Sequence, residues 1–402
     1  MAKLLDLPLE LREQIYSYVV HPSPARGPEC SECGTSYRYD LSLFRVNRQT
    51  YREALAVFRR ENVFALLETP WQGTEQHIAI EGHVPVVATG PRASMYPYVQ
   101  YHLGIRIEAP HHSTPDDNTF KLVLLMQDLP AFTRMWFYSN LTYPRLNNYL
   151  RLTLTLRNPY TSERTRTKTY AEVADMPAMA VGGRDKLPVK LQRQLLMPFG
   201  EVHNLDQVMF AGEPVDPGVE AGVREEMGRR PDSPEKCLAE AYKLKDEGNK
   251  AIKEGFYKDA IDCYEKSFLA VHIVCKGRRR SIWADAFFHT VLRGGEFHCQ
   301  EGAIVRLVLR VKLVANIVLA YLKLEDYDEA YFWGMRSIRL MREAADGDDN
   351  EPMLDFVAAV EMGKIYYRTG VAAKHLGDES EARNLLRVAI QYLPNDATLV
   401  SS

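Results

Sequence analysis

The sequence lacks several features that would assign it to common functional classes. Its 402 residues include no apolar run of the roughly eighteen residues that a membrane span needs. The first residues, MAKLLDLPLELREQ, lack the apolar core and small-residue cleavage site of a signal peptide. Six scattered cysteines indicate reduced thiols, and a net charge of -3 gives no sign of nucleic-acid affinity. We therefore expect a cytoplasmic protein, present also in the nucleus, that binds neither membranes nor nucleic acids.

Motifs for catalysis and for metal binding are also scarce. No phosphate-cradling glycine loop, nucleophile elbow or HExxH motif occurs, so we expect no enzymatic activity and no cofactor. Cys30 and Cys33 form one CxxC and are weak metal candidates, because zinc needs four ligands and only His21 lies nearby. A solvated loop is the expectation for His111, His112, Asp116 and Asp117. In the insertion, no common metal site has the spacing of His272, Cys275, His298 and Cys299.

The N-terminal residues predict two amphipathic helices separated by a loop of about twenty residues. Residues 3–20 form the first, with Pro8 in its first turn. Apolar residues recur there at helical spacing and predict its buried face: Leu7, Leu11, Ile15, Tyr18 and Val19. Those expected to face inward from the second helix are Phe44, Val46, Tyr51, Ala54, Leu55 and Phe58.

This helix pair resembles the F-box-like N-terminus that is common in fungal proteins. The similarity covers residues 1–65 and rests on the stretch LFRVNRQTYREALAVFRRENVF together with Leu7, Pro8, Glu10, Leu11, Ile15 and Tyr16. An F-box docks on the adaptor subunit of cullin ubiquitin ligases. The resemblance therefore implies docking through Leu7, Pro8, Leu11 and Ile15.

Residues 66–220 predict a small α/β layer with a partly parallel sheet, because strand and helix patterns alternate. Leu103, Ile105 and Ile107 share one face of a strand, and the leucines at 150, 152, 154 and 156 share a face of another. An irregular leucine-rich stack is the alternative, although no fixed period is present. Gly, Pro and charged residues over 211–235 favour a linker, assigned to 221–235.

The C-terminal residues 236–402 contain three related helical hairpins. Ala260, Ala330 and Ala382 occupy equivalent places where two helices approach closely, and the turn positions align as Gly255, Glu325 and Gly377. An insertion at about 272–303 separates the first two hairpins and predicts a longer helix or an exposed loop, with Arg278, Arg279 and Arg280 in solvent. The hairpins resemble the tetratricopeptide repeat, so the expected fold is an α+β multidomain chain ending in an all-α superhelix.

Five residues of the hairpins match a subclass of that repeat family, the carboxylate clamp. They are Lys245, Asn249, Asn316, Lys364 and Arg368. The resemblance implies a groove that grips the acidic Glu-Glu-Val-Asp tails of heat-shock chaperones through charge-assisted hydrogen bonds. Our leading hypothesis is a non-catalytic adaptor for chaperone tails. The alternative is an F-box-type substrate receptor that recruits ligase substrates through the repeats.

Overall fold

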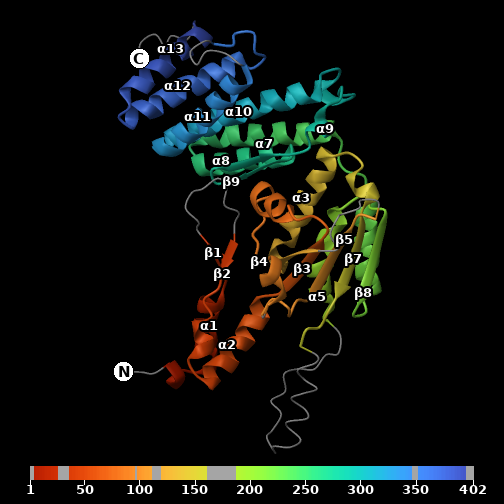
Figure 1. Ribbon diagram of the computed structural model, residues 1–402. Coiled ribbons are helices and arrows are strands. Elements are labelled where there is room, and N and C mark those ends of the chain that lie inside the picture. Colours follow the sequence, from red (N-terminus) through yellow and green to blue (C-terminus); the bar gives the residue numbers. More distant parts are fainter. Residues whose placement is uncertain are drawn as a thin grey trace, which may run out of the picture. The chain divides into compact units, whose positions relative to one another are not determined.

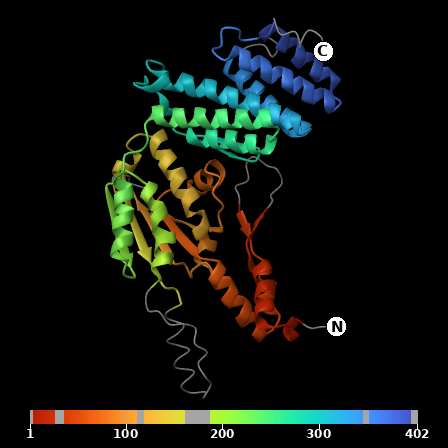
Figure 2. The same cartoon turned by 180° about the vertical axis from the view of Figure 1, so that it is seen from behind.

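The computed structural model describes residues 4–25, 36–95, 97–110, 119–160, 187–345 and 352–394. The chain forms two compact units, Met1–Arg230 and Pro231–Ser402 (Figures 1 and 2). The first is built of helices and one main sheet, and the second is almost wholly helical. Within the described ranges, no helix combines the length and apolarity needed to cross a bilayer.

The first unit is organised around a mixed six-stranded sheet of order β4-β6-β3-β5-β7-β8. Its strands are β3 (Phe64–Thr69), β4 (Ala88–Thr89), β5 (Leu103–Glu108), β6 (Phe120–Leu125), β7 (Arg151–Leu156) and β8 (Gln207–Gly212). Pairs β3–β5 and β7–β8 are parallel and the other three are antiparallel, so the predicted partly parallel sheet is confirmed and a leucine-rich stack is excluded.

Alternating leucines place one face of the sheet in the core. Leu103, Ile105 and Leu154 are buried, as the strand pattern predicts, and Leu154 pairs with Ile105 in the register of β5 and β7. Beside the sheet lie α3 (Leu129–Thr142), α5 (Val189–Leu196) and α6 (Pro217–Gly228) (Figures 1 and 2). The predicted linker at 221–235 is therefore wrong in part, because α6 buries Val219 and Val223 and extends to Gly228.

The predicted N-terminal helices form as α1 (Leu9–Val20) and α2 (Arg48–Glu61), but α1 buries a different face from the predicted one. Tyr16, Val20 and Phe58 join the core formed with β3 and β6. Leu11, Ile15 and Tyr18, by contrast, are 48%, 38% and 77% exposed. Val46 and Tyr51 also face solvent, whereas Ala54 and Phe58 are buried as expected. Helical periodicity fits both faces of α1, and contact with the sheet selects the one carrying Tyr16.

Short elements complete the unit. They are the antiparallel pair β1 (Ser23–Ala25) and β2 (Ser36–Arg38), and the single turns η1 (Leu4–Asp6), η2 (Ser42–Arg45), η3 (Gln76–Glu81), η4 (Gly90–Ser94), η5 (Met126–Asp128), η6 (Leu146–Tyr149) and η7 (Met197–Glu201). Since one core joins α1 and α2 to β3 and β6, the two N-terminal helices pack as part of the sheet unit.

The second unit consists of three helical hairpins. They are α7 (Pro234–Glu254) with α8 (Tyr257–Ala270), α10 (Gly302–Lys323) with α11 (Tyr327–Ala345), and α12 (Ala359–His375) with α13 (Glu379–Tyr392). The first helix of the second hairpin packs against those of the other two. The equivalent alanines at 260, 330 and 382 are all buried. This is the arrangement of tetratricopeptide-like repeats.

The inter-helix turns confirm the repeat frame at the level of backbone conformation. Gly255, Glu325 and Gly377 have φ values of +84°, +60° and +87°. The left-handed conformation ends each first helix, and glycine adopts it without steric cost. Three equivalent positions therefore share one geometry even though one of them is not glycine.

The insertion differs from both predictions, because it is neither a longer helix nor a simple loop. Its elements are the antiparallel hairpin β9 (Ile273–Lys276) and β10 (Arg279–Ile282), the short α9 (Asp285–Phe288) and η8 (Gly295–Phe297). Arg278 is not a free surface cation, because it pairs with Asp328 and, at 2.8 Å, with Glu329 of α11. Arg279 and Arg280 are likewise only partly exposed. Opposite charges on α11 hold the hairpin against the repeats.

Candidate peptide-binding groove

The five predicted clamp residues lie on the first helices of the three hairpins. Lys245 and Asn249 are on α7, Asn316 is on α10, and Lys364 and Arg368 are on α12. Because α10 packs against both α7 and α12, three helices that are distant in sequence form one wall. We call these five residues the clamp set.

Three of the clamp set meet in one polar cluster. Asn316 Nδ2 donates to Asn249 Oδ1 at 2.7 Å, and the Tyr264 hydroxyl of α8 donates to the same oxygen at 2.9 Å. Arg368 Nη1 donates to the carbonyl oxygen of Ala315 at 2.5 Å, beside Asn316. The structure thus brings Asn249, Asn316 and Arg368 together.

Burial shapes the electrostatics of this cluster. It raises the pKa of Tyr264 to about 12, although the nearby Arg368 charge acts in the opposite direction. Burial also lowers the pKa of Arg368, so its cation sits in surroundings that solvate it poorly. Such a guanidinium gains more from an incoming carboxylate than a fully hydrated one does. Gly248 permits the arrangement, because a Cβ there would lie 2.5 Å from the Tyr264 ring.

The two lysines of the clamp set lie one helical turn before this cluster. Lys245 Nζ is 2.8 Å from Asp246 Oδ1 and 4.9 Å from the centre of the Tyr242 ring. Lys364 is exposed and makes no ion pair or hydrogen bond with another residue in the described ranges. The Lys364 ammonium is therefore open to a ligand, whereas the Lys245 ammonium is already paired with Asp246.

The structure adds a cation that the sequence reasoning missed. Lys312 lies on α10, four residues before Asn316, and its Nζ is 5.8 Å from the Tyr242 ring centre. Lys245 precedes Asn249, and Lys364 precedes Arg368, by the same four residues. Residues four apart share a helix face. The four-residue spacing is the sequence signal for Lys312. It gives each of the three first helices a lysine one turn before Asn249, Asn316 or Arg368.

Tyr242 connects the cations to the insertion. The Phe297 ring of η8 lies 4.9 Å from the Tyr242 ring, in a tilted arrangement. Burial raises the pKa of Tyr242 to about 12, with smaller contributions from Glu296, Glu361 and Asp246. Aromatic surface beside ammonium groups can hold an apolar side chain next to a carboxylate. We call the surface of Tyr242, Phe297, Lys245 and Lys312 the aromatic end of the groove.

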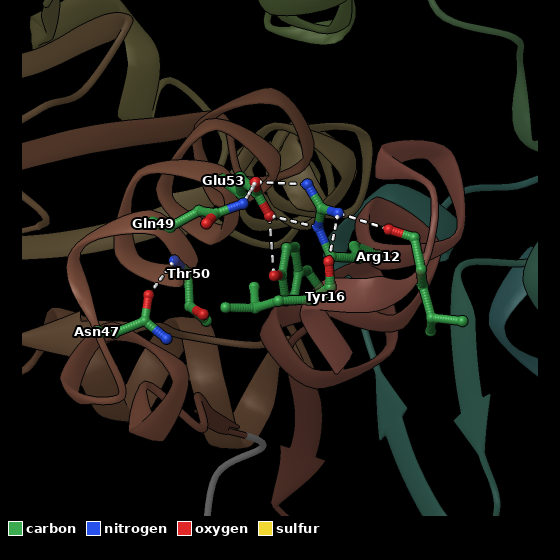
Figure 3. A network of polar contacts seen from close by, with 8 residues as sticks. Arg12, Tyr16, Asn47, Gln49, Thr50 and Glu53 are labelled. Atoms are coloured by element: carbon green, nitrogen blue, oxygen red, sulfur yellow. Dashed lines mark hydrogen bonds and ion pairs between the residues drawn. The ribbon is translucent and has the colours of Figure 1, made fainter. Parts of the chain in front are cut away.

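The residues implied in ligase docking lie on α1. Pro8 is the exposed N-cap residue, Leu7 is half-buried, and Leu11 and Ile15 are exposed. A polar network holds α1 to α2 (Figure 3). In it, Arg12 Nη2 and Nε donate to the Glu53 carboxylate at 2.7 and 2.9 Å, and Tyr16 donates to it at 2.9 Å. This network therefore holds α1, which carries the exposed Leu11 and Ile15, in a defined position against α2.

Most of the metal candidates lie outside the part of the chain that the structure describes. Cys30, Cys33 and the group from His111 to Asp117 lie outside it. Among described residues, no group of three or more His, Cys, Asp and Glu side chains has a metal-binding arrangement.

No known protein-family model matches the chain, and no curated protein matches it. Among solved structures, the chain is similar to the C-terminal TPR-containing domain of a putative FK506-binding protein of Plasmodium falciparum. The identity is 18% and the TM-score 0.28, over 42% of this chain and 87% of that one. At that TM-score the likeness carries no argument, so the repeat assignment rests on the hairpins themselves.

Proposed function

We propose that the protein is a non-catalytic adaptor whose repeat groove binds the acidic C-terminal tails of heat-shock chaperones in the cytoplasm or nucleus. One observation carries the proposal: the shared hydrogen bonding of Asn249, Asn316 and Tyr264, with Arg368 beside them. Carboxamide donors next to a poorly hydrated guanidinium suit a terminal carboxylate. The lysines one turn away suit the acidic side chains upstream of it.

The decisive experiment titrates a peptide ending in Glu-Glu-Val-Asp against the full chain. We expect a dissociation constant on the order of micromolar, about -8 kcal/mol. Lys364→Ala should weaken binding about tenfold, about 1.4 kcal/mol. Lys258→Ala is a matched control, because Lys258 is an exposed lysine on α8, outside the clamp set.

A second peptide tests the recognition of the chain terminus. The same peptide with an amidated C-terminus lacks the α-carboxylate, and it should bind far more weakly than the free acid. Equal binding of acid and amide, or equal binding by wild type and Lys364→Ala, contradicts the clamp proposal.

The exposed row on α1 favours a second function, docking on the adaptor subunit of a cullin ubiquitin ligase. Leu11 and Ile15 expose apolar surface on a helix that already has a buried face. Scattered apolar residues are normal on surfaces, but a row on one short helix is typical of an interaction site.

A pull-down with purified adaptor tests this function. Capture should require Leu11 and Ile15, so that Leu11→Asp and Ile15→Asp abolish it while Met95→Asp does not. Met95 is a suitable control because it is 61% exposed and belongs to the same unit. No capture of the wild-type chain would rule out the docking function and leave the clamp proposal untouched.

A further inference from the structure

Three arginines converge where the insertion meets the second repeat. Arg280 lies on β10, Arg310 on α10 and Arg336 on α11. Arg336 donates to the carbonyl oxygens of Arg278 at 2.7 Å and Arg280 at 3.3 Å, which places its guanidinium against the hairpin. Burial, followed by the charges of Arg336 and Arg310, lowers the pKa of Arg280 to about 10. The other two cations therefore repel Arg280 in partly buried surroundings. We call the three arginines the arginine cluster.

Two members of the cluster lack partners for buried donors. The Nε atoms of Arg280 and Arg310 are buried and make no hydrogen bond with any residue that the structure describes. The Phe268 ring gives Arg280 little compensation, because its centre is 6.0 Å away, at the outer limit of a cation–π contact. Burying the hydrogen-bond donors of a charged group without acceptors costs free energy. A ligand that accepts hydrogen bonds from these donors would therefore be favoured at this site.

The neighbouring carboxylates are already engaged with other arginines. Asp328 and Glu329 pair with Arg278, and Asp285 pairs with Arg306 at 2.6 Å. Glu265 on α8 forms no ion pair with the arginine cluster among the described residues, and burial raises its pKa. Burial lowers the pKa of Arg310, and the charge of Asp285 acts on it in the opposite direction. Asp328, Glu329 and Asp285 nevertheless each form their ion pair with an arginine outside the arginine cluster.

We propose that the arginine cluster binds a phosphate dianion, either free or as the terminal group of a small phosphorylated metabolite. Guanidinium groups match phosphate oxygens with two parallel hydrogen bonds each, and a dianion offsets two of the three charges. Each of the three side chains retains partial exposure, so an anion can reach them from solvent. This site is separate from the groove and does not depend on the proposed function.

Thermal unfolding of the full chain in sodium phosphate, compared with sodium chloride at equal ionic strength, tests the proposal. Wild type should show a saturable rise in Tm with phosphate. Arg310→Gln should remove the saturable part entirely, while its Tm in chloride equals or exceeds that of wild type because repulsion is relieved. Arg339→Gln is the control, since Arg339 is exposed on α11, three residues after Arg336. A parallel series with glycerol 2-phosphate distinguishes a site for the free ion from one that admits an ester.

Phosphate also stabilises proteins generally by exclusion from their surface, so the difference between wild type and variant is decisive. Should Arg310→Gln fail to fold by circular dichroism, Arg280→Gln serves in its place, and phosphorus NMR line broadening measures binding to wild type directly. An equal phosphate response in wild type and both variants, or the absence of any saturable response, overturns the proposal.

Discussion

Asn316 donates a hydrogen bond of 2.7 Å to Asn249 Oδ1, and so links α10 to α7 at the centre of the candidate groove. The same oxygen accepts from Tyr264, which fixes the orientation of the Asn249 amide. Two first helices and one second helix therefore share a single acceptor atom. Substitutions that remove the hydrogen bonds to this oxygen therefore test how the three helices are held together, without any ligand.

Asn249→Ala removes the acceptor and leaves two donors without a partner, whereas Asn316→Ala removes one donor. We expect Asn316→Ala to destabilise the repeat unit by about 1 kcal/mol and Asn249→Ala by about 2 kcal/mol. The double variant should show a coupling of about 0.5–1.5 kcal/mol. Urea unfolding followed by tryptophan fluorescence measures this in a Trp71→Phe, Trp136→Phe background, where only Trp283 and Trp333 of the repeat unit emit. Additive single effects would show that the three side chains do not act as one cluster.

Lys312 should contribute to binding of an acidic tail even though it lies outside the clamp set. Its Nζ and that of Lys245 both lie near the Tyr242 ring, at 5.8 and 4.9 Å from the centre. Lys312→Ala should weaken binding of the Glu-Glu-Val-Asp peptide by about two- to fivefold, the range of a partly hydrated charge pair. The loss should shrink as salt is added, because salt screens exposed charges. An unchanged affinity at low salt would mean that Lys312 packs on Tyr242 but does not contribute to peptide binding.

The sequence was sufficient to predict the repeat frame because that frame depends on local requirements. The frame requires a small buried residue in each second helix, and a left-handed turn before that helix. Each hairpin meets both requirements by itself, with Ala260, Ala330 and Ala382 as the small residues. The strands at 103–108 and 151–156 also follow a local pattern, because their alternating apolar residues face one core. From this frame, Asn249, Asn316 and Arg368 could be placed together without any three-dimensional information.

Features that depend on distant partners could not be predicted in this way. Which face of α1 is buried depends on contact with β3 and β6, and Leu11 and Tyr16 fit a helical period equally well. The three arginines at 278–280 were expected in solvent, because nothing local indicates that Asp328 and Glu329 of α11 receive Arg278. The four-residue spacing of Lys312 from Asn316 is visible in the sequence, but its proximity to Tyr242 of α7 depends on how α10 packs and could not be predicted.

The network around Glu53 should make the first unit sensitive to acid. Hydrogen bonding from Arg12, the largest cause, lowers the Glu53 pKa to about 2. A lowered folded-state pKa stabilises the fold fully above the ordinary value of 4.5, and this contribution is lost as pH falls from there towards 2. Glu53→Gln should therefore increase amide exchange in α1 and α2 at neutral pH, and the difference from wild type should disappear near pH 2.

Asp206→Asn provides the comparison for that measurement. Asp206 pairs with Arg151 at 3.0 Å, but both side chains are more than 40% exposed, so the pair contributes little. Exchange in α1 that responds equally to Asp206→Asn and Glu53→Gln would mean that the network is not what holds α1 to α2.

Glu325 offers a stabilising substitution at the turn between α10 and α11. Its φ is +60°, where an L-residue with a Cβ is disfavoured by roughly 1–2 kcal/mol. Glycine removes that strain but loses roughly 0.5–1 kcal/mol through the greater freedom of the unfolded chain. Glu325→Gly should therefore stabilise the repeat unit by about 0.5–1 kcal/mol, measured by urea unfolding in the same tryptophan background. The reciprocal change Gly377→Glu, at the equivalent turn with φ +87°, should destabilise by a similar amount. If both variants shifted stability in the same direction, the two turns would not be equivalent, and the shared repeat geometry would not explain the strain at Glu325.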